Sequence, residues 1–370
     1  MIPVCEPVLG GNEKKYVLEC LETNWISSAG KFLDRFEKMV REQCNACHAI
    51  ACSSCTTGLH LAFEVLDLKP GDEVIVPAFN LIAGTNMAVL AGGKPVLVDS
   101  DPETWCIDAR KIAEKITPRT RAIMPVHMYG HPCDMDPIME LAQKHNLIVI
   151  EDVAEAHGAE YKGKQLGAIG QIGCFSFYAN KNVTTGEGGM VVTNNDDYEK
   201  RIRMMRNQGF QKLRFVHELR GFNYRLTNLQ AAIGVAQMER LDAIVKRRRD
   251  LAAEYRKRLQ GQRGVLVASE APWAKSVFWQ ICILLTDEFG ATKDEVMSKL
   301  HADGVETRSF FCPMNLQPLF SGKNKRFPDL RGSYPVSERL WKQGLYLPSG
   351  LNLTDGQIDE VVEKLLRCRK

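Results

Sequence analysis

Short apolar runs alternate with amphipathic stretches between about residue 50 and residue 240. Several of the runs are apolar almost throughout, which is typical of strands buried on both faces of a largely parallel sheet. The segments between the earlier runs, such as 136–146, are compatible with helices. This alternation predicts an α/β fold in which helices flank a mostly parallel sheet. The predicted strands are 73–79, 95–100, 122–130, 147–154, 172–179 and 189–195.

The C-terminal part of the chain has a different pattern and predicts a smaller α+β domain. A long helical stretch at 226–260 leaves the first domain, so we divide the chain into a large domain, 1–245, and a small domain, 246–370. Strands are predicted at 277–285 and 304–311, and a loop at 312–335.

Two helices of the small domain are predicted from their capping boxes, in which an N-cap hydroxyl and the third helical side chain bond each other's backbone N–H. Thr292 and Glu295 open a helix at 293–303. Thr354 and Gln357 open the last helix, whose apolar positions share one face. These positions are Ile358, Val361, Val362 and Leu365.

Composition and charge exclude several classes of function. The chain has 370 residues, of which 45% are hydrophobic and 25% charged, and its net charge is only +3. This is the mixture of a globular protein, and no basic block suggests a nucleic-acid or membrane-surface partner. The N-terminus has no apolar signal segment and no apolar run is long enough to span a bilayer. We therefore expect a cytoplasmic protein.

The cysteines require separate consideration. Cys44, Cys47, Cys52 and Cys55 form two CxxC pairs, as metal-binding knuckles do. A zinc ribbon separates its pairs by a longer loop, and here the second pair runs into a helix start. We therefore expect reduced thiols and no metal site.

Three features that could carry chemistry lie where predicted strands end or a helix begins. Asp152 follows one strand and Lys181 another, and the hydroxyl-rich run 53–58 precedes a helix. Ligands of open α/β sheets collect at the carboxyl ends of strands, and a helix N-terminus binds anions. A carboxylate, an amine and a phosphate nest are the minimal set for pyridoxal phosphate. Taken singly, each has an ordinary alternative: a solvated lysine, a capping aspartate, an N-cap.

A resemblance adds weight to this interpretation. The block EDVAEAHGAEYKGKQLGAIGQIGCFSFYANKNVTTGEGGMVVTN (151–194) resembles the core signature of the DegT/DnrJ/EryC1/StrS family of sugar aminotransferases, and the similarity extends along essentially the whole chain. Further matching segments are IPVCEP, NWISSAGKFLDRFE, GDEVIVPAF, PVHMYGHPCDMDPI, GFNYRLTNLQAAIGVAQ and ETRSFFCPM. The resemblance implies the aspartate-aminotransferase fold, with a large seven-stranded domain and a small C-terminal α+β domain, and pyridoxal phosphate as cofactor.

The same resemblance implies roles for individual residues. Lys181 would form the imine with the cofactor and move protons, while Asp152 would pair with the pyridinium nitrogen. Glu155 is also expected at the cofactor, with a surface position on a helix as its ordinary alternative. Asn223 would reach the phosphate from the neighbouring subunit, which implies a homodimer with shared active sites. The other expected phosphate ligands are Cys55, Thr56 and Ser176.

The resemblance also implies a substrate class. The combination of EDVAEA, FYANK, GFNYRLTNLQAAIG and TRSFFCPM most resembles members that aminate C4 of GDP-4-keto-6-deoxymannose with glutamate. Residues expected near the sugar nucleotide are Trp25, Ser27, Ser28, Lys31, Arg308, Phe310 and Phe311. The two phenylalanines could instead pack the small-domain core.

Two positions depart from the family pattern. Cys55 stands where the phosphate turn usually has glycine, which is tolerated only if the turn needs no positive φ. Leu81 stands where an aromatic ring often covers the cofactor, so either Phe79 takes that role or an aliphatic face suffices.

Several alternatives remain open at this point. A UDP- or dTDP-linked keto sugar could be the substrate, and amination could occur at C3 rather than C4. A dehydratase of this fold has histidine at the lysine position, which argues against that activity here. A non-catalytic sugar-nucleotide-binding regulatory protein is disfavoured because Asp152 and Lys181 are both present.

Overall fold

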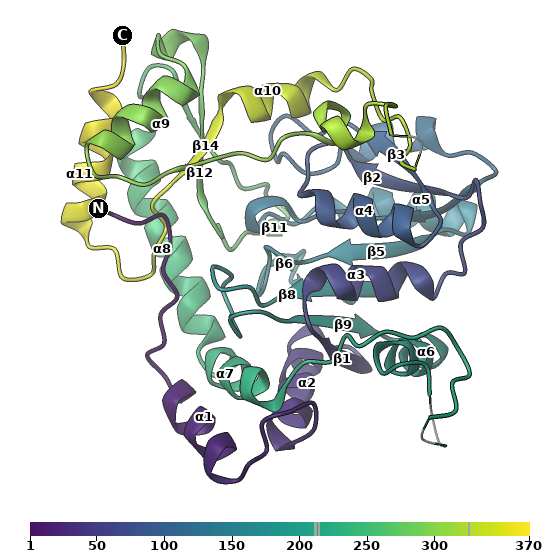
Figure 1. The fold of residues 1–370 in the computed structure, drawn as a ribbon. Coiled ribbons are helices and arrows are strands. Elements are labelled where there is room, and N and C mark those ends of the chain that lie inside the picture. Colours follow the sequence, from purple (N-terminus) through teal and green to yellow (C-terminus); the bar gives the residue numbers. More distant parts are fainter. Residues whose placement is uncertain (211–212, 214, 325) are drawn as a thin grey trace.

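A seven-stranded sheet lies at the centre of the computed structural model, which describes residues 1–370 except 211, 212, 214 and 325 (Figure 1). Its strand order is β1-β9-β8-β5-β4-β2-β3. Neighbouring strands are parallel except that β9 is antiparallel to both β1 and β8. The predicted α/β class with a mostly parallel sheet is confirmed. The strands are β1 (His48–Cys52), β2 (Glu73–Pro77), β3 (Lys94–Val98), β4 (Thr120–Ile123), β5 (Ile148–Asp152), β8 (Ile172–Ser176) and β9 (Gly189–Thr193).

Helices α3 and α4 of the large lobe lie across this sheet and pack against it, whereas α1 and α7 pack against other helices (Figure 1). The apolar positions Leu59, Ala62 and Phe63 of α3 are fully buried, as their helical spacing predicts. The helices of this part are α1 (Glu13–Glu22), α2 (Lys31–Cys44), α3 (Cys55–Glu64), α4 (Ile82–Leu90), α5 (Met135–His145), α6 (Asp196–Arg206) and α7 (Asn228–Met238).

The C-terminal lobe has an antiparallel four-stranded sheet of order β10-β12-β14-β13. The helical stretch predicted at 226–260 is interrupted between α7 and α8, and α8 leads from α7 to this lobe (Figure 1). Both predicted capping boxes are present, at α9 and α11. The elements are α8 (Leu241–Leu259), β10 (Val265–Val267), β12 (Ile281–Leu285), α9 (Lys293–Ala302), β13 (Arg308–Ser309), α10 (Pro335–Gln343), β14 (Gly344–Leu347) and α11 (Asp355–Leu366).

Two features cross the predicted boundary between 1–245 and 246–370, which stays a prediction. The N-terminal residue Ile2 pairs with Val305, and its side chain belongs to the core of the C-terminal lobe. A three-stranded sheet joins β11 (Ala274–Lys275) to β6 (Glu160–Tyr161) and β7 (Lys164–Gln165) of the large lobe.

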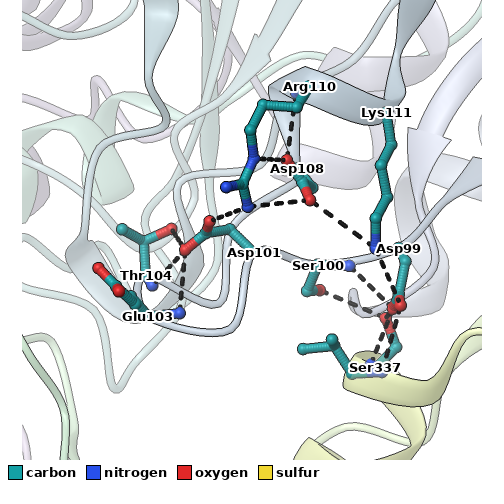
Figure 2. Close-up of polar contacts among 10 residues, drawn as sticks. Asp99, Ser100, Asp101, Glu103, Thr104, Asp108, Arg110, Lys111 and Ser337 are labelled. Carbon is teal, nitrogen blue, oxygen red and sulfur yellow. Dashed lines mark hydrogen bonds and ion pairs between the residues drawn. The ribbon is translucent and has the colours of Figure 1, made fainter.

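The first turn of α10 is fastened to the end of β3 by a carboxylate (Figure 2). Asp99 accepts hydrogen bonds from the backbone N–H of Val336 at 3.2 Å and of Ser337 at 2.9 Å, and from the Ser337 hydroxyl at 2.7 Å. The Lys111 Nζ lies 3.6 Å from the same carboxylate. Asp99 therefore caps a helix that belongs to a distant part of the sequence.

The four clustered cysteines occupy separate elements. Cys44 ends α2, Cys52 ends β1, and Cys55 begins α3; these three are buried, whereas Cys47 is exposed. Within the described residues, no group of three or more His, Cys, Asp or Glu side chains is arranged to hold a metal ion. None of the helices in the described part of the chain is both long and apolar enough to cross a membrane.

Candidate active site

A cavity of about 280 Å³ opens where β5 and β8 end and α3 and α4 begin. This is the edge of the sheet at which a parallel α/β fold places its ligands. The lining includes Ser54, Cys55, Thr56, Asn80, Leu81, Asp152, Glu155, Ser176, Tyr178, Asn180, Lys181, Glu187, Trp279, Phe311 and Tyr346. The predicted lysine, carboxylates and phosphate ligands of one chain thus share one cavity.

Lys181 lies in the loop after β8 with its side chain almost wholly buried. Its Nζ is 3.9 Å from Oε1 of Glu155 and 3.6 Å from the centre of the Trp279 ring. Burial lowers the pKa of this amine, and the nearby Glu155 and Asp152 partly oppose that effect. A lysine with a lowered pKa can exchange a proton closer to neutral pH than an exposed one.

Two carboxylates approach Lys181 from the end of β5. Asp152 accepts a hydrogen bond from the backbone N–H of Ala154 at 3.0 Å, and burial raises its pKa. Glu155 accepts from the backbone N–H of Tyr129 at 2.7 Å, and burial raises its pKa to about 7. Glu155 is therefore inside the protein rather than on a helix surface.

The N-terminus of α3 supplies the predicted anion nest. Ser54 is the N-cap and its hydroxyl accepts from the Thr57 N–H, so the side chain satisfies the third helical N–H. Cys55 and Thr56 hold the first two helical positions, whose N–H groups have no acceptor within the helix. Cys55 has a helical backbone, so the turn keeps its donor without needing glycine there.

A close approach of two elements builds this nest. A Cβ on Gly189, the first residue of β9, would lie 2.3 Å from the carbonyl carbon and oxygen of Ser54. Only glycine allows that distance, so the TTGEGG run serves the packing of β9 against α3. The hydroxyl of Ser176, at the end of the adjacent β8, also lines the cavity.

Leu81 and Phe79 differ in where their side chains lie. Leu81 lies on the wall, whereas Phe79 is fully buried among Tyr129, Phe310 and Phe311. An aliphatic face therefore occupies the position where relatives often have an aromatic ring.

Of the residues expected near the sugar nucleotide, only Phe311 lines this cavity. Phe310 is 2% exposed and packs against Trp105 and Tyr129. Arg308 is 61% exposed, lies 2.5 Å from the Glu306 carboxylate, and pairs in the sheet with Tyr346 of the cavity wall.

The other expected residues lie elsewhere on the same chain. Trp25 is exposed, and the Ser27 carbonyl accepts from the Asn228 N–H at 2.6 Å. Lys31 forms an ion pair with Glu19. Ser28 lines a separate hollow with Arg206 and Asn207, and Asn207 pairs with the exposed Asn223.

Several wall residues were not expected from the sequence. Trp279 lies within the strand predicted at 277–285 and just before the observed β12, and its position gives no local sign of a role at the site. Tyr346, in β14, likewise has no feature in its local sequence that indicates a role at the site. Tyr178 and Asn80 lie close in sequence to expected residues, so proximity alone could have suggested them.

The donor set fits pyridoxal phosphate, the cofactor that the resemblance implies. Asp152 is a buried acid suited to a protonated ring nitrogen, and Lys181 is a buried amine. The free N–H groups of Cys55 and Thr56 and the hydroxyl of Ser176 suit a phosphate group.

Comparison with known proteins agrees with this chemistry. Residues 7–366 match the DegT/DnrJ/EryC1/StrS aminotransferase family. A GDP-perosamine synthase of Caulobacter vibrioides is 46% identical over 98% of this chain and 97% of its own length, and one of Escherichia coli O157:H7 is 42% identical over 98% and 97%. The crystal structure of Streptomyces venezuelae DesV superposes with a TM-score of 0.89 at 35% identity, covering 96% of this chain and 94% of that one.

The match confirms the expected class of enzyme, a pyridoxal-phosphate-dependent sugar aminotransferase. It extends over nearly the whole chain, so it covers both the large sheet and the C-terminal lobe. The chain belongs to the DegT/DnrJ/EryC1/StrS aminotransferase family.

Proposed function

We propose that this enzyme transfers an amino group from glutamate to C4 of GDP-4-keto-6-deoxymannose and so forms GDP-perosamine. The observation that carries the chemistry is the buried Lys181, which shares one cavity with Asp152 and the open N-terminus of α3. The observation that favours this substrate is the likeness to the two GDP-perosamine synthases over almost the full length of each chain.

Pyridoxal phosphate, when bound, supplies an electron sink through which an amino group passes from donor to acceptor. Asp152 is proposed to hold a proton at the ring nitrogen, because a carboxylate there favours the charged ring. Lys181 is proposed to bind the cofactor and to carry a proton at Nζ during each half of the reaction. Glu155, 3.9 Å away, is proposed to contact the cofactor and to share the positive charge of Lys181.

The phosphate is proposed to lie at the N-terminus of α3, bound by the N–H groups of Cys55 and Thr56 and by Ser176. Asn223 is proposed to complete this site in a neighbouring subunit of a homodimer. Its exposed position, outside the cavity of its own chain, is consistent with that arrangement. The proposed dimer has C2 symmetry, the commonest closed symmetry, in which each chain gives and receives the same contact.

The sugar nucleotide is proposed to enter over Phe311 and Tyr346, with Arg308 at the rim for the diphosphate. Trp25, Ser27, Ser28 and Lys31 are proposed to contribute from the N-terminal segment, and Phe310 to support the wall from behind. The proposed location is the cytoplasm, since twelve free cysteines suit a reducing compartment.

A substrate panel tests the proposal. Purified enzyme with pyridoxal phosphate and glutamate is offered GDP-, UDP- and dTDP-linked 4-keto-6-deoxy sugars, and 2-oxoglutarate formation is measured. The expected result is a clear preference for the GDP-linked sugar and a product whose NMR spectrum places the amine on C4. A preference for a UDP- or dTDP-linked sugar, or an amine on C3, would overturn the proposed substrate and leave the class of enzyme unchanged.

A further inference from the structure

Trp279 contacts Lys181 through two different parts of its side chain. The centre of its ring lies 3.6 Å from the lysine Nζ. Its Nε1–H donates to the carbonyl of Asn180 at 2.8 Å, and that carbonyl belongs to the peptide bond that leads into Lys181. Trp279 is 3% exposed, so neither contact competes with bulk water. One indole thus contacts both the side chain and the main chain of the lysine.

The backbone around Trp279 is held in an unusual conformation. Phe278, the preceding residue, has φ 44°, which is rare for a bulky residue and costs free energy. The Trp279 N–H donates to the carbonyl of Tyr129 at 3.0 Å, and Tyr129 itself has φ 51°. A Cβ on Gly130 would lie 3.0 Å from the Trp279 nitrogen, so this approach needs glycine. Strain of this kind persists where the surrounding structure holds a functional geometry.

The same turn also fixes the carboxylate on the other side of Lys181. Tyr129 donates its N–H to Oε2 of Glu155 at 2.7 Å, while its carbonyl accepts from Trp279. The turn at Tyr129 therefore sets both the π face and the carboxylate that lie next to the ammonium. Two groups that favour a cation are held by one strained segment.

An ammonium over an indole face is attracted by the negative charge of that face, and the attraction grows as water is excluded. The other ionisable groups that face Lys181 come from the end of β5, the loop after it and the start of α3. They are Asp152, Glu155, His157 and Cys55. The two carboxylates favour the charged lysine, and burial opposes it.

We propose that Trp279 is a positioning residue for Lys181: its ring favours the ammonium form of the amine and its N–H fixes the peptide bond that aims it. This role rests on the proposed function of Lys181. The indole would stabilise the ammonium that forms once the neutral Nζ has taken up a proton, until that proton is returned to the substrate.

The test is the pH dependence of Lys181 acetylation in the full chain freed of cofactor, followed by peptide mass spectrometry, because only the neutral amine reacts. Trp279→Met fills much of the volume without a π face, and Trp279→Leu is a second variant of the same kind. Both should move the midpoint of acetylation down by about 0.5 to 1.5 pH units, since a desolvated cation–π contact has that strength.

Trp279→Phe keeps a ring and loses the N–H, so it should move the midpoint by less than half as much. Trp341→Leu is the matched control, because Trp341 contacts another lysine, Lys293, at 5.5 Å and should leave Lys181 unchanged. An unchanged or raised acetylation midpoint in the folded Trp279→Met or Trp279→Leu variant would overturn the proposal. A midpoint lowered as much in Trp279→Phe as in those two variants would also overturn it.

The measurement separates this proposal from the proposed function. Acetylation reports the protonation of Lys181 whether or not that residue binds the cofactor. If the acetylation midpoint shifts as expected but the cofactor is found on a different lysine, the proposed function of Lys181 is wrong and the role of Trp279 stands. If the cofactor is on Lys181 but the acetylation midpoint is unchanged in the Trp279 variants, the role of Trp279 is wrong and the proposed function stands.

Discussion

The Asp99 carboxylate caps α10 through the N–H and the hydroxyl of Ser337, which lies 238 residues further along the chain (Figure 2). Asp99 lies directly after β3. Helix α10 follows the segment that contains Phe311 of the cavity wall. A second contact, from the Met314 N–H to the Ala78 carbonyl at 2.8 Å, joins the same segment to the end of β2. The segment that contributes Phe311 to the cavity wall is therefore anchored to the large sheet.

Asp99→Ala should lower the free energy of unfolding by about 2 kcal/mol, because a helix cap and charge-assisted hydrogen bonds are lost together. Chemical denaturation monitored by circular dichroism measures the change. Asp329→Ala is the control, since Asp329 pairs with Arg331 on the surface, where ion pairs contribute little. Equal losses in the two variants would contradict the capping role.

The separation of two contacting residues along the chain explains which contacts could be predicted from the sequence and which could not. The capping boxes at Thr292 and Thr354 lie within four residues, and both were predicted and found. The cap from Asp99 to Ser337 depends on how two lobes meet, and no local pattern contains it. Strand β1 was not predicted, because its five residues are the four between the two cysteine pairs and Cys52 itself, and this segment was considered only as a possible metal site.

The part of the candidate site that lies at the ends of parallel strands could be predicted from the sequence. Asp152 and Ser176 end neighbouring strands and Lys181 follows one of them, so their convergence follows from the sheet. Trp279 reaches Lys181 from the segment just before β12 of the other lobe, and the placement of that lobe is not encoded in hydrophobic periodicity. The resemblance supplied the expectation for Arg308, but the exposed position of its side chain is a tertiary property.

Glu155→Gln should change how stability depends on pH. Burial raises the pKa of Glu155 from 4.5 to about 7, so the folded protein binds its proton more tightly than the unfolded chain does. Stability from this group is present below pH 4.5 and is lost as the pH rises to 7 and above. The wild type should therefore lose roughly 3 kcal/mol relative to the glutamine variant between pH 4.5 and pH 8.

Unfolding by urea at a series of pH values measures this difference. Glu363→Gln, at an exposed pair with Arg367, is the control and should follow the wild type. A constant difference between wild type and Glu155→Gln across this range would mean that the pKa of Glu155 is not raised in the folded protein.

Lys181→Ala should abolish transamination and leave the fold intact, because the side chain contributes an amine rather than core packing. Borohydride treatment of the wild-type enzyme, followed by peptide mapping, should place the cofactor label on Lys181. Lys164→Ala, at an exposed position on β7, should keep both label and activity. A label on any other lysine would remove Lys181 from its proposed role.

Asn223→Ala and Lys181→Ala chains should each be inactive as homodimers and should regain activity when mixed. In a mixed dimer one site takes Lys181 from one chain and Asn223 from the other, so it is intact, while the second site carries both lesions. Equal mixing should restore about a quarter of the wild-type activity, since about half of the dimers are mixed. Mass spectrometry of the intact dimers verifies the exchange, and no recovery after verified exchange would rule out the shared site.

Arg308→Ala should raise KM for the sugar nucleotide by roughly tenfold or more and leave KM for glutamate nearly unchanged, because only the nucleotide offers a diphosphate for a charge-assisted fork. Arg308 pairs in the sheet with Tyr346 on the cavity wall, and its exposed guanidinium needs only to exchange Glu306 for the ligand.

Arg331→Ala is the matched control, because Arg331 has the same kind of exposed pair with Asp329. Measuring each half-reaction separately distinguishes the roles that Arg308 could have. Damage confined to the sugar-nucleotide half would support a diphosphate contact. Equal impairment of both half-reactions would instead place Arg308 on the donor carboxylate. The feature that glutamate shares with the nucleotide is a negative charge, so one guanidinium would then have to bind both anions at the same rim of the cavity.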